Sequence, residues 1–265
     1  MTETQNPEGT YYNMFSAKTD VKGQDGGVVT SLLLKGFQED LFDAAIVARR
    51  IDGYHAKAVV AQTAKEISEA SGTMYLKVNV SAKLRELNAE GKRRIAVVCT
   101  PCEAAVVRKI QQTTDIDLDL IIIGLFCFEA FNHDKLKAEV QKQLGIDLDV
   151  VDRVQVRGGK FIAENANGNA TCKVKDLDCA AEASCHLCGD FTSESADISV
   201  GSIGSSEGYS TVIVRTPAGE RLVKGLKALK AEVNSAEVYR LAGFKHARAQ
   251  KSLSESAKTL KNNVI

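Results

Sequence analysis

Two Cys-x-x-Cys pairs are the residues of this chain whose types and spacing point most directly to chemistry. The first is Cys99-Thr100-Pro101-Cys102 and the second is Cys185-His186-Leu187-Cys188, with Cys127 between them in the sequence. Such pairs are typical of a zinc site, an iron–sulfur cluster or a redox dithiol. Two separated pairs and a fifth thiol exceed what one dithiol needs, so a metal centre is favoured.

Spacing alone does not decide which metal centre the thiols form. A closed tetrahedral zinc site would take the four thiols of the two pairs, and zinc is the main rival to an iron–sulfur cluster. Cys127 by itself could equally be a small buried hydrophobic residue. Cys172 is interpreted in that way, and Cys179 is left open between packing and ligation.

The expected secondary structure brings three thiols to one edge of a sheet. Residues 94–98 and 118–126 have the pattern of buried strands, and helices are expected at 101–111 and 134–144. Ligand sites in open α/β sheets lie at the carboxyl ends of strands, so Cys99, Cys102 and Cys127 would share one edge. Cys185 and Cys188 must arrive from the second part of the chain.

Strands that alternate with helices up to residue 150 predict an α/β fold (mixed α+β). Its N-terminal, largely parallel sheet would be covered by helices, including helices at 28–37 and 81–91 with Ser81 as the N-cap of the latter. The pattern then changes to a smaller segment of β-hairpin and helix that carries Cys185 and Cys188. We therefore expect an α/β region at 1–150, which carries Cys99, Cys102 and Cys127, and a β-rich and helical region at 151–265. The second region would include a helix at 217–230 and a basic C-terminal tail at 245–265.

Composition excludes several classes of protein. The formal net charge of the 265 residues is +0, so no bulk electric field attracts nucleic acid, and no apolar run has the length of a membrane span. The polar N-terminus has no signal-peptide h-region, which predicts a cytoplasmic protein. Because thiols stay reduced in the cytosol, the 7 cysteines are expected to bind metal rather than to form disulfides.

Three glycine-containing loops are candidates for phosphate binding. They are Gly23–Gly27 before a helix, Ser71–Thr73 followed by Tyr75, and Gly201–Gly208. Free backbone N–H groups and a helix dipole attract anions, so the three loops suggest an extended ligand such as a dinucleotide. No Walker lysine follows and the Gly-x-Gly-x-x-Gly spacing is absent, so each loop could equally be a plain connection.

In combination, the motifs resemble the coenzyme F420 hydrogenase/dehydrogenase beta-subunit family. The similar segments extend from about residue 10 to residue 230, and the combination is more specific than any one of them. They are Gly23–Thr30, Ser71–Tyr75, Thr100–Glu103, Gly124–Cys127, Cys185–Phe191, Ala196–Gly201 and Gly208–Ser210.

The resemblance implies an FAD-binding subunit with a [4Fe-4S] cluster that reduces coenzyme F420. The family has a thiol where Cys102 stands and usually glycine where Cys99 stands, so the implied cluster ligands are Cys102, Cys127, Cys185 and Cys188. No side chain is expected to be catalytic, because the cofactors carry the chemistry. The predicted cofactor contacts are Gly23, Gln24, Asp25, Gly26, Gly27, Thr30, Ser71, Thr73, Tyr75, Gly201 and Gly204.

The resemblance also implies an electron path and partners. Single electrons would enter the cluster, pass to FAD and leave as hydride to coenzyme F420. The expected donors are the nickel–iron large subunit and the iron–sulfur small subunit of a hydrogenase, and a formate dehydrogenase is the close alternative. A structural zinc-binding module is the alternative from a different class.

The remaining basic and imidazole side chains of interest lie outside the metal centre. Coenzyme F420 has an acidic oligoglutamate tail, and a basic site for it is expected among Lys245, His246, Arg248 and Lys251. His55 and His133 fit no motif and are interpreted as ordinary surface residues.

Overall fold

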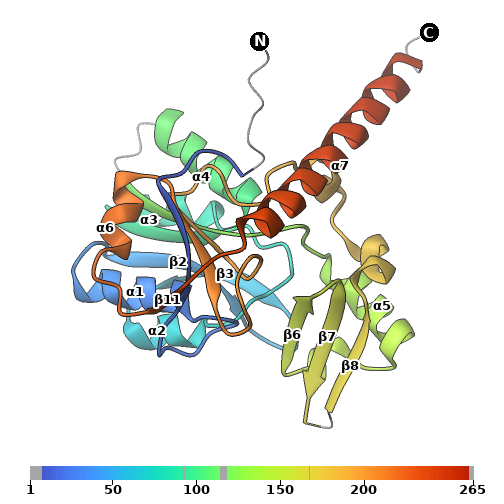
Figure 1. The fold of residues 1–265 in the computed structure, drawn as a ribbon, viewed down its shortest axis with the longest axis horizontal. Coiled ribbons are helices and arrows are strands. Elements are labelled where there is room, and N and C mark those ends of the chain that lie inside the picture. Colours follow the sequence, from blue (N-terminus) through green and yellow to red (C-terminus); the bar gives the residue numbers. More distant parts are fainter. Residues whose placement is uncertain (1–7, 92, 114–117, 167, 263–265) are drawn as a thin grey trace.

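The computed structural model describes residues 8–91, 93–113, 118–166 and 168–262, and the polar N-terminal segment 1–7 lies outside them (Figure 1). Its largest element is an eight-stranded sheet. The strands, in spatial order, are β11 (Leu229–Ala231), β1 (Asn13–Lys18), β10 (Ser210–Val214), β9 (Ile198–Gly201), β5 (Asp119–Leu125), β4 (Arg94–Cys99), β2 (Ala44–Arg50) and β3 (Ala56–Ala61).

The centre of this sheet is parallel and its flanks are antiparallel. Strands β2, β4, β5 and β9 run in the same direction, whereas β3 on one side and β10, β1 and β11 on the other pair antiparallel. The register sets Cys99 opposite Gly124 and Leu125 opposite Val200. The carboxyl ends of the four parallel strands therefore meet at one edge.

Helices cover both faces of the sheet, because the buried strands alternate apolar side chains between two cores. On one face, α1 (Val28–Gln38), α2 (Ala64–Glu69) and α6 (Pro217–Val223) pack on the core that includes Ala96 and Val98. On the other face, α3 (Ala82–Ala89) and α4 (Pro101–Thr113) pack on the core that includes Ile95 and Val97. The predicted α/β class with a covered, largely parallel central sheet is confirmed.

A smaller unit stands beside the main sheet and has its own core (Figure 1). Strands β6 (Arg153–Arg157), β7 (Lys160–Asn165) and β8 (Gly168–Lys173) form an antiparallel sheet that packs with α5 (His133–Leu144) around Phe131 and Phe161. Short 3-10 turns η1 (Leu148–Val150), η2 (Val174–Ala180) and η3 (Ala183–Leu187) complete it. The second Cys-x-x-Cys pair begins inside η3.

The last helix, α7 (Ser235–Asn262), packs against η3 and then projects away from the body (Figure 1). It begins ahead of the basic tail predicted from residue 245 onward. The main sheet takes β9, β10 and β11 from beyond residue 150, where the sequence pattern changes. The two sides of that division are therefore joined by backbone hydrogen bonds within one sheet.

Two local predictions are wrong. The helix expected at 217–230 ends at Val223, because Lys224 leaves helical geometry with a ψ of 124° and Gly225 adopts a φ of 77°. Ser81 occupies the N-cap position of α3 as predicted, but the expected capping by its side chain is wrong, since its backbone is helical and its side chain makes no capping hydrogen bond. Asn79 Oδ1 accepts the Ala82 N–H at 3.1 Å instead.

Candidate thiol site and adjoining cavity

Four thiols from three parts of the chain gather at the carboxyl edge of the main sheet. Cys102 lies in the first turn of α4, Cys127 follows β5, and Cys185 and Cys188 lie in and just after η3. Cys102, Cys185 and Cys188 are all close enough to Cys127 for their charges to raise its pKa, and Cys102 and Cys188 act in the same way on Cys185. The structure thus brings the four implied ligands together.

Hydrogen bonds hold the segments that carry these thiols. The Cys127 N–H donates to the Phe191 carbonyl at 3.0 Å, which ties the end of β5 to the segment after Cys188. The Ala130 N–H approaches the Cys185 sulfur at 3.4 Å. The carboxylate of Asp190 accepts two backbone N–H groups, from Ser193 and Glu194, and so fixes the turn that follows the pair.

Burial controls the protonation of the central thiol. Removal from water raises the pKa of Cys127 to about 12, the Lys245 ammonium opposes this rise, and the neighbouring thiols add to it. Burial is also the first cause of the raised pKa of Cys185. To bind a metal centre, these thiols would have to lose their protons, and positive charge nearby would have to stabilise the thiolates that result.

Helix α7 supplies positive charge to the thiol site. This corrects the expectation that Lys245 and Arg248 bind an acidic tail. Lys245 is 1% exposed and its ammonium donates to the Cys127 carbonyl at 2.6 Å. Arg248 donates to the Phe128 carbonyl at 2.9 Å and forms an ion pair with Glu129 at 2.8 Å. Both side chains are thus engaged in the loop after Cys127 and are not available for an acidic tail, whereas His246 and Lys251 are exposed.

The other three cysteines are placed differently, although Cys99 lines the adjoining cavity and is close enough to Cys102 for that thiol to raise the Cys99 pKa. Cys99 is buried at the end of β4 in a core of apolar side chains, and burial raises its pKa strongly. Cys172 packs at the edge of the small unit's core, and Cys179 is exposed. The choice of Cys127 over Cys99, which spacing could not make, agrees with this arrangement.

The described cysteines include no three whose sulfur atoms all lie within 4.8 Å of one another. Sulfur ligands at about 2.3 Å from one zinc ion lie about 3.8 Å apart. All seven cysteines belong to the described residues, yet the one group of three or more side chains there that is compact enough to share an ion contains no cysteine. A larger group, in which each thiolate binds a different metal atom, fits the arrangement better.

A cavity adjoins the thiols at the same edge of the sheet. Its empty volume is about 1040 Å³ and it is open to solvent. The ends of β2, β4, β5 and β9 form its floor, and the first turn of α1 lies at its rim. Thr100 belongs to its lining, and the Thr100 hydroxyl lies 3.4 Å from the Cys102 sulfur. Thiol site and cavity therefore share a wall.

Most of the predicted cofactor contacts line this cavity. Eight of them do so: Gly23, Gln24, Asp25, Gly27, Thr30, Ser71, Thr73 and Gly201. A second hollow of about 1670 Å³ shares the segments around Gly23 and Ser71 and extends toward Tyr54 and Arg153. The glycine loop and the 71–73 loop, remote in sequence, thus form one continuous groove.

Three predicted contacts lie outside both linings. Gly26 packs so closely on β1 and β10 that an added Cβ would stand 2.4 Å from the Ala17 carbonyl oxygen. Tyr75 is half-buried, and its hydroxyl oxygen accepts the Val156 N–H at 3.1 Å. Gly204, with a φ of 87°, packs against the start of α7.

Glu103 is a residue whose role the sequence did not reveal. Its carboxylate accepts the backbone N–H groups of Val80 and Ser81 at 3.1 and 2.9 Å. Val80 lines the cavity, and Glu103 follows Cys102 in α4, so one side chain ties the cavity wall to the thiol helix. The acidic residue next to the Thr-Pro-Cys segment was the available signal.

Fold and site together have the features of an α/β oxidoreductase subunit that holds redox cofactors. Two family models, for the N-terminal and the C-terminal parts of the coenzyme F420 hydrogenase/dehydrogenase beta subunit, match residues 12–85 and 92–238 respectively. The chain belongs to the coenzyme F420 hydrogenase/dehydrogenase beta-subunit family. The resemblance seen in the sequence is confirmed.

Individual relatives agree with this placement. The coenzyme F420 hydrogenase subunit beta of Methanococcus voltae is 35% identical over 231 residues, which cover 82% of this chain and 81% of that protein. A coenzyme F420-dependent sulfite reductase of Methanocaldococcus jannaschii is 33% identical over 93% of this chain, but only 41% of the reductase is covered.

A solved structure gives the same fold. A chain of the F420-reducing [NiFe] hydrogenase complex from Methanosarcina barkeri superposes with a TM-score of 0.89 and is 30% identical. The match covers 94% of this chain and 93% of that chain. None of the described helices of the present chain has the length and apolar character that crossing a membrane requires.

Proposed function

We propose that this chain is an iron–sulfur flavoprotein subunit that carries electrons between a partner protein and coenzyme F420. The observation that supports this most strongly is the shared wall between the four thiols and the cavity. One-electron and two-electron carriers must lie close together for electrons to pass, and Thr100 touches both places. A site for either carrier alone would not need this contact.

The thiol site suits a [4Fe-4S] cluster held by Cys102, Cys127, Cys185 and Cys188. Such a cluster with four thiolates carries net negative charge, which is costly to bury without compensation. The buried Lys245 ammonium, bonded only to a carbonyl and to no carboxylate among the described residues, supplies that compensation. A structural zinc module would need four thiols compact enough to share one ion, and the described cysteines form no such group.

The cavity suits the diphosphate and ring system of FAD. Gly27, with a φ of 67°, starts α1 without a side-chain cap, so the first N–H groups of the helix are free to bind an anion. Apolar side chains such as Val47, Val98 and Leu125 line the deeper part and would exclude water from a ring. When bound, FAD supplies the exchange between single electrons and a hydride.

The partners follow from the proposed chemistry and from the relatives. The likeness to a chain of the F420-reducing [NiFe] hydrogenase complex supports a hydrogenase as the electron donor. As the partners we propose its nickel–iron large subunit and its iron–sulfur small subunit, in the cytoplasm. A formate dehydrogenase is the second candidate, since the family model names dehydrogenases as well. Co-purification from the native host distinguishes the two donors.

The test begins with the chain purified without oxygen. Iron, zinc and flavin are measured on one sample, and oxidation of reduced coenzyme F420 is then followed with a viologen dye as electron acceptor, which replaces the partner. We expect one flavin and about four irons per chain, with F420-dependent dye reduction. Zinc without flavin, or cofactors without F420 activity, would contradict the proposal.

Replacing Lys245 by methionine should lower the reduction potential of the cluster. The reduced cluster carries one more negative charge, and the nearby ammonium stabilises it. With an effective dielectric constant of about 20 and a separation of about 6 Å, the expected shift is on the order of 100 mV. A potential titration followed by electron paramagnetic resonance measures it. Lys251→Met, on the exposed face of α7, is the control, and equal potentials in both variants would contradict this role.

A further inference from the structure

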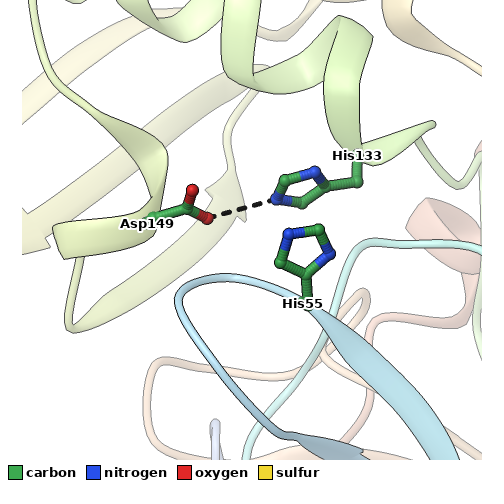
Figure 2. A group of neighbouring side chains, drawn as sticks. All are labelled: His55, His133 and Asp149. Carbon is green, nitrogen blue, oxygen red and sulfur yellow. Dashed lines mark hydrogen bonds and ion pairs between the residues drawn. The ribbon is translucent and has the colours of Figure 1, made fainter.

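His55, His133 and Asp149 form a compact group that contains none of the thiols. The potential ligand atoms of all three lie within 4.8 Å of one another (Figure 2). His55 follows the turn between β2 and β3, His133 opens α5, and Asp149 lies in η1. The interpretation of His55 and His133 as ordinary surface residues is wrong for His133, whose side chain is 14% exposed and faces two carboxylates.

The surroundings of His133 and Asp149 hold these side chains in place. The His133 Nδ1 lies 3.0 Å from the Asp134 carboxylate, and its Nε2 lies 3.2 Å from Asp149 Oδ1. Asp149 Oδ1 accepts the Tyr54 N–H at 3.0 Å, and its other oxygen bonds to Lys137. A carboxylate that binds the second nitrogen of an imidazole is the usual support of a metal-binding histidine.

The short distance between Nε2 and Oδ1 needs something between the two atoms. If Nδ1 carries the proton that donates to Asp134, Nε2 presents a lone pair to an anionic oxygen. A proton or a cation must then bridge them. Ligands at about 2.0–2.2 Å from a tetrahedral ion lie about 3.3–3.6 Å apart, close to the 3.2 Å observed.

His55 can complete the group. Its ring stacks on that of His133 with centroids 3.5 Å apart, and Figure 2 shows one of its nitrogens on the side that faces Asp149. His55 is exposed on the hairpin, so its ring is free to tilt out of the stack toward a shared ion. The hairpin is held close by Gly53, where an added Cβ would stand 2.6 Å from Asp149 Oδ1.

We propose that His55, His133 and Asp149 bind one divalent cation of the zinc class, with water as the fourth ligand. Two imidazoles and a carboxylate are a donor set that zinc accepts, and three protein ligands leave one position open. Tyr54 and Arg50 line the second hollow and both bond to Asp149. A bound ion would therefore fasten the β2–β3 hairpin to α5 behind the wall of the groove.

The test measures zinc binding by the full-length chain in competition with a chromophoric zinc chelator. The wild type should bind one more zinc per chain than His55→Ala, and the affinity of this site should fall at least tenfold in the variant. Zinc held by thiols is common to both proteins and cancels in the difference. His246→Ala removes an exposed imidazole elsewhere and should bind zinc as the wild type does. Equal binding by wild type and His55→Ala would overturn the proposal.

A second variant separates the loss of a zinc ligand from a loss of folding. His55→Cys keeps a zinc ligand, so it should retain the extra zinc. X-ray absorption at the zinc edge should then show a sulfur neighbour at about 2.3 Å, in place of one nitrogen at about 2.0 Å. Retention of zinc with no change in the neighbours of the metal would place the ion elsewhere and overturn the assignment.

Discussion

Replacing Cys127 by alanine is expected to remove the iron of this chain, whereas Cys99→Ala should leave it in place. Cys127 stands among the thiols of Cys102, Cys185 and Cys188, whereas Cys99 is buried against an apolar core beside the cavity. Iron should fall from about four atoms per chain to below about one in the first variant. F420-dependent dye reduction should disappear with it. Iron and sulfide analysis after anaerobic purification measures the difference.

The pair of variants is matched, since both remove one thiol at the same sheet edge. Cys99 is 3% exposed, so its loss should cost about 1 kcal/mol of folding free energy through a small cavity. Circular dichroism and thermal melting separate such a cost from loss of a ligand. If Cys99→Ala lost the iron and Cys127→Ala kept it, the ligand set would be wrong.

Replacing Gly27 by alanine is expected to abolish tight flavin binding. Gly27 has a φ of 67°, and an added Cβ would stand 1.9 Å from the Val21 carbonyl oxygen and 2.8 Å from Thr19 Oγ1. The left-handed conformation alone costs an alanine about 1–2 kcal/mol. The overlap adds to this and forces the loop away, which displaces the N-terminus of α1 from the cavity. Flavin affinity should fall more than tenfold, equivalent to about 1.4 kcal/mol.

Gly145 provides the control for this substitution. It ends α5 with a φ of 69°, nearly that of Gly27, but an added Cβ there meets nothing within 4 Å. Gly145→Ala should therefore show the backbone strain without the overlap and keep its flavin. Fluorimetric titration of the flavin-free proteins compares the two. Equal losses of affinity in both would mean that general destabilisation, not the loop, is responsible.

Local sequence patterns were sufficient to predict a helix or strand where the residues of that element alone determine its structure. The apolar run 94–98 became β4, and the Pro101 start of α4 appeared as expected, because a buried strand and a proline in the first helical turn are set by neighbouring residues. The helix expected at 217–230 failed for a similarly local reason: the left-handed Gly225 follows its end, and glycine at that place was a visible signal.

Long-range contacts decided what the patterns left open. Ser81 fits a capping position by type, yet Asn79 and Glu103 satisfy the N–H groups there. Lys245 and Arg248 have the charge expected of a site for an acidic tail. The packing of α7 instead turns them into the loop after Cys127. Residue type does not determine direction on a long helix, since the helix can be docked through any of its faces.

The sequence by itself determined the α/β class, the family and the set of residue types that can carry redox chemistry. Those features depend on periodicity and on short motifs. Only the tertiary structure showed that Cys127 lies among the other implied ligands, because Cys185 and Cys188 reach the edge of the sheet from a distant segment of the chain. It also joined His55, His133 and Asp149, which no motif connects. Side chains this far apart in sequence meet only when separate elements pack, and the energies of that packing are spread over the whole core.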